Sequence, residues 1–238
     1  MIKVSHLCKS LKGQPILKDI NFEVARGEVL AILGQSGAGK SVLLKHLIGL
    51  FVPDSGSIEI DSMNILEFSD LDWLTLRKKM GYLFQDGALY DFMTILENVS
   101  FPLKEHTQLT VHEIEQKVKS TLDLVGLDGQ QSKYPSELSG GMQKRAALAR
   151  AVILNSEILL CDEPTSGLDP IRSRDIADEI LNISRHFNTT TIITSHDIKN
   201  SLRIADRLII MKDGALVAQG TRQEIETTDN KFVKEFLN

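Results

Sequence analysis

The chain has 238 residues, a formal net charge of −5 and only two cysteines, Cys8 and Cys161. The length suffices for one large domain with a sizeable core, and the acidic balance disfavours a general binder of nucleic acid or anionic membranes. Two isolated cysteines make a disulfide framework unlikely and offer no cysteine zinc site. No apolar run approaches the roughly 18 to 20 residues that span a bilayer, and the first residues lack the apolar core of a signal peptide. We therefore expect a cytoplasmic protein, for which a peripheral position on a membrane through a partner stays open.

The first third of the chain predicts a strand, a glycine-rich loop and a helix in succession. Residues 29–33 (VLAIL) form an apolar run bounded by glycines, which is typical of a buried strand. Residues 41–51 carry apolar side chains at helical spacing. A short strand at 58–60, a helix at 71–79 and an extended stretch at 81–84 are predicted next.

The rest of the chain predicts helices first and then strands. One apolar stripe indicates a helix at 112–125, and Ser139 is typical of an N-cap for a helix at 139–153. Further strands are predicted at 158–161 (ILLC), 191–194 (TIIT), 208–211 and 216–218. The last two flank Asp213-Gly214, which is typical of a hairpin turn. This order predicts a largely parallel α/β sheet with an antiparallel edge, interrupted by a mostly helical insert at about 86–157.

A phosphate-binding loop is indicated at 34–41, where GQSGAGKS fits the pattern G-x-x-x-x-G-K-[ST] between a strand and a helix. Its glycines let the backbone turn its N–H groups inward, and the helix adds the positive end of its dipole. We expect the lysine to reach the β- and γ-phosphates and the serine hydroxyl to bind Mg²⁺. The expected nucleotide-binding residues are Gly34, Gln35, Ser36, Gly37, Ala38, Gly39, Lys40 and Ser41.

Two acids end the predicted strand in ILLCDE, residues 158–163. Ligand groups in α/β sheets are presented at strand ends. We expect Asp162 to hold the Mg²⁺, and Glu163 to act as general base on the attacking water or to orient it. Paired acids could instead cap a following helix, but Pro164 and the loop TSGLD come next.

A second anion site is indicated where LSGGM, residues 138–142, opens the helix at 139–153. Glycine in a helix interior costs about 1 kcal/mol relative to alanine, and it is explained if a ligand approaches the backbone closely. Ser139 and the N–H groups of Gly140 and Gly141 then form the site. An ordinary N-cap followed by flexible glycines explains the pattern equally well at this point.

Taken together, the motifs resemble a known family. GQSGAGKS, Gln85, LSGGM, ILLCDEP, SGLD at 166–169 and His196 occur in this order, and the chain resembles the ATP-binding subunits of ABC transporters over essentially its whole length. The resemblance implies one ABC ATP-binding domain over 1–238. Its fold would be that of a P-loop NTPase with a RecA-like core, an antiparallel β-subdomain and an α-helical subdomain at about 86–157.

The resemblance also implies a mechanism. Two subunits would form a head-to-tail homodimer in which each ATP lies between the phosphate loop of one and the segment Ser139–Met142 of the other. The implied roles are Mg²⁺ and water sensing, together with coupling to the membrane subunit, for Gln85, a cross-dimer loop at Ser166–Asp169, and a γ-phosphate contact for His196. ATP and Mg²⁺ are the implied cofactors.

The chain departs from the family pattern at two positions. Met142 stands where glutamine is common, and we expect activity to survive because Ser139 and the glycines supply the atoms that face the phosphate. Leu11 stands where the family often stacks an aromatic ring on adenine. Leucine lacks the aromatic contribution of roughly 0.5–1.5 kcal/mol, so we expect weak base discrimination, with GTP hydrolysed alongside ATP.

The segment LFQDGALYDF, residues 83–92, fits neither a helix nor a strand, although it carries many large apolar side chains. Together with the rest of LFQDGALYDFMTILENVSFPLKEHTQL and with SELSGGMQKRAALARA, it resembles the Mla-type ATPases (the MlaF and Mkl group), which power lipid transport between bacterial membranes. We interpret Gln85 as facing the nucleotide and Leu89, Tyr90 and Phe92 as the surface that receives a permease helix. Packing within the insert is the alternative for each apolar side chain.

The partners implied are a transmembrane permease of the MlaE type, with MCE-domain and STAS-domain subunits as further candidates. The ATPase would lie on the cytoplasmic face of the inner membrane. The alternative is an importer of a small polar solute such as an amino acid. Non-transport ABC ATPases are a weaker alternative, since no coiled coil and no second ATPase unit is evident. Nucleic acid is not an expected partner.

Overall fold

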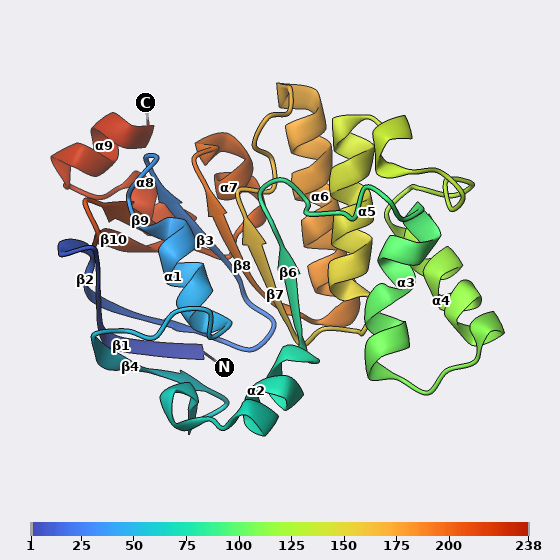
Figure 1. Ribbon diagram of the computed structural model, residues 1–238. Helices are drawn as coiled ribbons and strands as arrows, with labels where there is room; N and C mark the ends of the chain where they lie inside the picture. The colour runs from blue at the N-terminus through green and yellow to red at the C-terminus, as the bar shows by residue number, and fades with distance from the viewer. Residues whose placement is uncertain (1, 238) are drawn as a thin grey trace. The chain divides into compact units, whose positions relative to one another are not determined.

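The computed structural model describes residues 2–237, which divide into two compact units (Figure 1). The first unit contains the chain up to Arg77 and again from Thr190, and the second contains Lys78–Thr189. The resemblance predicted one ATP-binding domain with a helical subdomain at about 86–157, and those boundaries stay a prediction. Each unit is described below by itself.

The first unit contains an antiparallel sheet in the order β2-β1-β4-β5. Its strands are β1 (Ile2–Leu11), β2 (Gln14–Val24), β4 (Ser55–Ile60) and β5 (Met63–Asn64). Lys12 and Gly13 connect the first two strands with φ values of 51° and 78°, as a tight hairpin turn requires. The residue patterns predicted only part of β4, whereas the family resemblance predicted an antiparallel subdomain.

The first unit also contains mainly parallel strands around β3. These are β3 (Val29–Gly34), β8 (Thr190–Ser195), β9 (Arg207–Lys212) and β10 (Ala215–Thr221). β3 pairs in parallel with β8 and β9, and β10 is the antiparallel edge. Every residue of β3 and β8 is buried, as the apolar runs predicted. The predicted hairpin at Asp213-Gly214 is confirmed, with φ values of 47° and 82°.

Five helices of the first unit are described: α1 (Lys40–Leu47), α2 (Asp70–Arg77), α7 (Ile198–Ile204), α8 (Arg222–Glu226) and α9 (Lys231–Leu237). The prediction that the first helix runs to residue 51 is wrong. Gly49 has a φ of 69°, and a Cβ there would lie 2.4 Å from the Trp73 ring. A left-handed glycine is a common helix end, and here the close tryptophan also requires it.

The second unit pairs β6 (Met80–Leu83) in parallel with β7 (Ile158–Asp162) and adds four helices. These are α3 (Ile95–His106), α4 (Val111–Leu124), α5 (Gly140–Val152) and α6 (Pro170–Phe187). In Figure 1, α5 lies between α3 and α6, and it contacts both. The predicted helices at 112–125 and 139–153 are confirmed within one residue. Within 2–237, no helix is long and apolar enough to cross a membrane.

Candidate functional site

The phosphate loop connects β3 to α1 in the first unit. Gly37 and Gly39 have φ values of 82° and 102°, which side-chain-bearing residues rarely adopt. A Cβ on Gly34 would lie 2.7 Å from the Met211 carbonyl oxygen. The conformation of the loop and the room around it therefore both require glycine.

Lys40 is the first residue of α1 and is only 5% exposed. Its Nζ donates hydrogen bonds to the carbonyl oxygens of Gly34, at 2.7 Å, and of Gln35, at 3.2 Å. Ser41 follows in the first turn of the helix. Gln35, Ser36 and Gly37 are exposed, so a ligand can reach the backbone here. A buried ammonium group, a helix N-terminus and an accessible loop backbone together suit a phosphate chain.

His196 directly follows the strand beside the phosphate loop. β3 and β8 are parallel neighbours, with Leu33 opposite Ser195. Gly34 and His196 therefore leave adjacent strands at the same edge of the sheet, where open α/β sheets bind ligands. The His196 side chain is exposed.

Leu11 is half-buried at the end of β1, in the hairpin that leads to β2. The same hairpin approaches the phosphate loop, because a Cβ on Gly39 would lie 3.0 Å from the Ile16 carbonyl oxygen and 2.9 Å from the Leu17 side chain. The hairpin that carries Leu11 is thus adjacent to the loop expected to hold phosphates. The stacking role of Leu11 stays a prediction.

The two acids of the second unit lie at the end of β7. Asp162 and Glu163 are 6% and 9% exposed. The Tyr82 hydroxyl donates to Asp162 Oδ2 at 3.3 Å, and burial together with this carboxylate raises the pKa of Tyr82. Complete burial raises the pKa of the neighbouring Cys161 thiol, so this cysteine is not a reactive thiolate.

Glu163 has a backbone conformation that its sequence does not reveal. Its φ is 47°, in the left-handed region that residues other than glycine rarely adopt. Such strained residues cluster at functional sites, where the surrounding structure holds a side chain in one direction. This carboxylate is the one expected to activate water.

Gln85 follows β6, the parallel neighbour of β7, with Leu83 opposite Cys161. Gln85 and the two acids therefore leave adjacent strands at one edge within the second unit. The exposed Gln85 amide Nε2 donates to Ser166 Oγ at 3.4 Å. This contact brings the glutamine to the loop that continues to Asp169.

The signature segment, residues 138–142, opens α5. Ser139 is the N-cap, with its hydroxyl accepting from the Met142 N–H at 3.4 Å, as predicted. Ser139 and Gly140 are exposed. A Cβ on Gly140 would meet nothing closer than 3.8 Å, and one on Gly141 nothing closer than 3.7 Å. Nothing within the described chain thus explains these glycines, which favours a ligand from outside.

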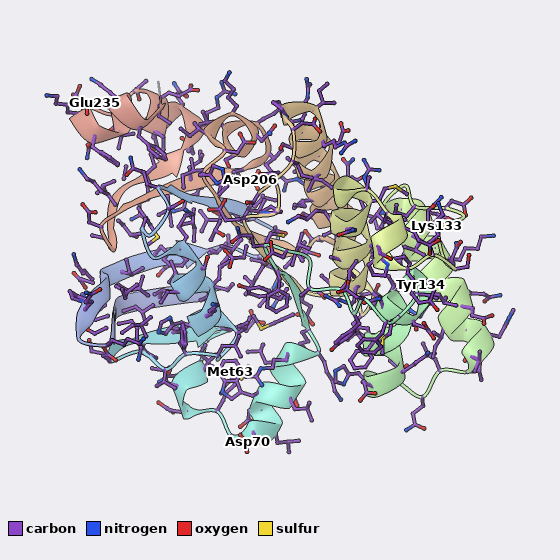
Figure 2. The ribbon with its side chains drawn as sticks, turned by 45° about the horizontal axis from the view of Figure 1, so that its top comes forward. Met63, Asp70, Lys133, Tyr134, Asp206 and Glu235 are labelled. Carbon is purple, nitrogen blue, oxygen red and sulfur yellow. The ribbon has the colours of Figure 1, made fainter. Side chains whose placement is uncertain are left out.

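The loop before this helix is partly exposed, with Lys133 half-buried and Tyr134 exposed. Lys133 and Tyr134, labelled in Figure 2, lie in the loop that leads to η2 (Pro135–Glu137) and then to the signature segment. The Lys133 carbonyl accepts from the Ile95 N–H at 2.8 Å, which ties the loop to the start of α3. The loop that leads to the N-terminus of α5 is therefore hydrogen-bonded to α3 at Lys133.

Asp169 has a local role that the sequence reading missed. Its Oδ1 accepts from the N–H groups of Ile171 and Arg172, both at 3.1 Å, so it is the N-cap of α6. The bond from the Arg172 N–H is the main cause that lowers the pKa of this carboxyl. The pattern Asp-Pro before a helix was the available signal, because Pro170 suits the first helical position.

Comparison with known proteins identifies the family of this chain. Residues 17–166 match the family described as ABC transporter. The chain is 43% identical over 237 residues to a probable ribonucleotide transport ATP-binding protein, mkl, of Mycobacterium leprae. It is 39% identical over 237 residues to the intermembrane phospholipid transport system ATP-binding protein MlaF of Haemophilus influenzae. The match covers all of this chain, 68% of the mycobacterial protein and 90% of the Haemophilus protein.

A solved structure has the same fold. It is described as the dimeric structure of a post-hydrolysis state of the ATP-binding cassette MJ0796 bound to ADP and Pi. It superposes with a TM-score of 0.85 at 30% identity and covers 93% of this chain and 99% of that one.

Proposed function

The chain belongs to the ABC transporter family and is one of its ATPase subunits, and from this premise we propose that it energises phospholipid transport between bacterial membranes. The printed name of the Haemophilus relative, intermembrane phospholipid transport, supports this cargo. The mycobacterial relatives, of whose length the chain spans about two thirds, are named for ribonucleotide transport. A polar-solute transporter is therefore the second candidate.

The ATPase site is built from the residues described above. Lys40 and the backbone of Gly34–Ser41 hold the phosphates, and Leu11 covers the base. Glu163 orients the attacking water or takes its proton, and His196 contacts the γ-phosphate. The strained backbone of Glu163 and its 9% exposure support this assignment, because strained residues and largely buried acids cluster at functional sites.

The chemistry of three proposed donors suits Mg²⁺. Ser41, Asp162 and Gln85 offer a hydroxyl, a carboxylate and an amide oxygen, and Mg²⁺ binds oxygen ligands and substrate phosphates. When bound, the ion neutralises charge that develops on the phosphates. Ser41 follows the lysine of the loop, and Asp162 and Gln85 come from neighbouring strand ends of the second unit.

The observation that supports a homodimer is the exposed N-terminus of α5. Ser139, Gly140 and Gly141 offer N–H groups to an anion, yet nothing in the described chain requires glycine there. ATP held by a second copy supplies such an anion. We therefore place Ser139–Met142, and the loop that ends at Asp169, at the interface of a homodimer. The dimeric state named for the solved relative supports this arrangement.

The remaining partner is a transmembrane permease of the MlaE type, which places the ATPase on the cytoplasmic face of the inner membrane. MCE-domain and STAS-domain chains are the further subunits that a phospholipid system would add. Tyr90 and Phe92 support a docking surface, because they are 40% and 75% exposed.

The test is affinity purification from native membranes, with identification of the bound chains. Recovery of a permease with an MCE-domain chain supports the phospholipid function. Recovery of a permease with a periplasmic solute-binding protein instead supports the second candidate and overturns the first. Tyr90→Asp should lose the permease but keep ATPase activity, whereas Val111→Asp, at an exposed residue of α4 in the same unit, should keep both.

A further inference from the structure

The segment from Phe84 to Thr94 lacks regular structure, yet its main chain is held by cations of α5. Lys144 Nζ donates to the Gln85 carbonyl oxygen. Arg150 donates from Nη2 to the Gly87 carbonyl at 2.8 Å and from Nη1 to the Ala88 carbonyl at 2.9 Å. Three carbonyls within four residues thus accept from two side chains of the signature helix.

The segment also lies close against the backbone of α5. Gly87 and Ala88 have φ values of 75° and 50°, so the chain turns through two successive left-handed residues. A Cβ on Gly87 would lie 3.3 Å from Ala147 Cβ. This turn presents the carbonyls of Gly87 and Ala88 to Arg150.

The far end of the segment is fixed by α3. Asn98 is fully buried, accepts from the Tyr90 N–H at 2.8 Å and donates to the Tyr90 carbonyl at 3.0 Å. The Arg150 guanidinium lies over the Tyr90 ring, 5.9 Å from its centroid. One arginine therefore contacts both the backbone after Gln85 and the aromatic side chain proposed to meet the permease.

Burying these two cations costs free energy of folding. Lys144 is 8% exposed, and removal from water lowers the pKa values of Lys144 and Arg150. The main-chain carbonyls offset part of this cost, but a neutral packing residue would avoid it. The long reach of Lys144 and the two-pronged donor of Arg150 match the spacing of the carbonyls.

We propose that Lys144 and Arg150 are positioning residues for Gln85. They fix to α5 the backbone that carries this glutamine. Loss of either cation therefore loosens Gln85, and the two residues set the affinity for Mg²⁺. The inference rests on the role of Gln85 in Mg²⁺ binding proposed above.

The test measures ATP hydrolysis by the full chain as Mg²⁺ is titrated, together with ATP affinity in the absence of Mg²⁺. Lys144→Met should raise the half-saturating Mg²⁺ concentration about tenfold, the lower end of effects from residues that orient metal ligands. ATP affinity without Mg²⁺ should stay unchanged. Lys144→Arg, which keeps the positive charge, should retain most of the wild-type Mg²⁺ affinity. Lys119→Met, an exposed lysine of α4, is the matched control.

A double substitution separates positioning from general stabilisation. Gln85→Ala should raise the half-saturating Mg²⁺ concentration, and Gln85→Ala with Lys144→Met should raise it no further, because coupled residues are not additive. If Lys144→Met does not fold, Arg150→Lys keeps the charge, loses one of two carbonyl contacts and should shift the Mg²⁺ dependence in the same direction.

Two results overturn the inference, and they differ in whether the proposed role of Gln85 also fails. If Gln85→Ala raises the half-saturating Mg²⁺ concentration while Lys144→Met and Arg150→Lys lower only thermal stability or kcat, positioning is excluded and the proposed role of Gln85 remains. If Gln85→Ala leaves the Mg²⁺ dependence unchanged, the proposed role of Gln85 fails and the inference fails with it.

Discussion

Single residues at this site combine a predictable identity with an unpredictable conformation. Glu163 is expected from its place after an apolar strand, but its left-handed backbone is a tertiary property. A residue other than glycine in that region costs of the order of 1–3 kcal/mol, which the surrounding structure must supply. Asp169 has an additional role that was not predicted. It is expected at a dimer interface, and the structure shows that it is also the N-cap of α6.

Glu163→Gln tests the proposed base. The amide keeps the shape of the side chain but cannot take a proton, so phosphate release should fall by at least about 100-fold while ATP binding persists. The ATP-bound variant should also elute as a dimer in size-exclusion chromatography. Glu157→Gln, a partly exposed residue paired with Lys79, should leave turnover unchanged. Near-normal turnover of Glu163→Gln would show that another group activates the water.

Leu11→Tyr tests the base-stacking position. An aromatic ring adds about 0.5–1.5 kcal/mol to contact with adenine, so the KM for ATP should fall roughly two- to tenfold. The wild-type protein should hydrolyse GTP appreciably alongside ATP. Steady-state kinetics with both nucleotides provide the measurement. An unchanged or raised KM for ATP would contradict the placement of Leu11 at the base.

At the scale of elements, α5 and α6 are joined by a contact between Arg145 and Glu179, a carboxyl group whose pKa is raised. Arg145 Nη1 lies 2.9 Å from Glu179 Oε1, and Arg145 also donates to the Val125 carbonyl. Burial raises the pKa of Glu179 to about 7, against the opposing effect of Arg145, and nearby Asp175 adds to the rise. Glu179 Oε2 is buried and makes no hydrogen bond among the described residues.

This protonation predicts a pH dependence of stability. From its ordinary pKa of 4.5 up to about 7, Glu179 holds its proton in the folded protein and loses it in the unfolded chain. The free energy of unfolding should therefore decrease as the pH rises through this window, by up to about 3 kcal/mol, and level off above it. Glu179→Gln should remove this component, measured by urea denaturation between pH 5 and pH 8.

The control for this experiment is Glu115→Gln, an exposed glutamate of α4. It should keep the wild-type pH dependence, because an exposed carboxyl is solvated in both states. The same pH profile for Glu179→Gln and the wild-type protein would exclude Glu179 as the titrating group.

For the whole molecule, the exposed start of α5 is a surface that no contact among residues 2–237 explains. The room around Gly140 makes a sharp test possible. Gly140→Leu replaces a poor helix former at an exposed position where a Cβ would meet nothing closer than 3.8 Å, so stability should be unchanged or higher by up to about 1 kcal/mol. ATP binding to the monomer should persist, whereas dimer formation and hydrolysis should be lost.

Thermal unfolding, nucleotide binding and ATPase assays distinguish the two explanations of this glycine. A stable variant that binds ATP without hydrolysing it supports a ligand held by a second subunit. A stable variant with full activity would mean that nothing approaches the helix closely, and the dimer proposed here would need another interface.

Much of the fold could be read from local patterns. Buried strands such as 29–33 and 158–161 are continuous apolar runs, and Ser139 marked the start of α5. The end of the first helix could not be placed, because Trp73 lies against Gly49 from a distant part of the chain. The long strands β1 and β2 were missed because mixed burial and register shifts hide their alternation.

The sequence by itself determined the family and the chemical groups of the site, because glycines, a lysine and acids at fixed spacing around strand ends carry that information locally. Only the tertiary structure decided how those groups are held. The left-handed Glu163, the cap made by Asp169 and the contacts of Lys144 and Arg150 with the segment after β6 join residues whose pairing no local pattern encodes. Those contacts arise from packing between elements, which depends on the folded backbone.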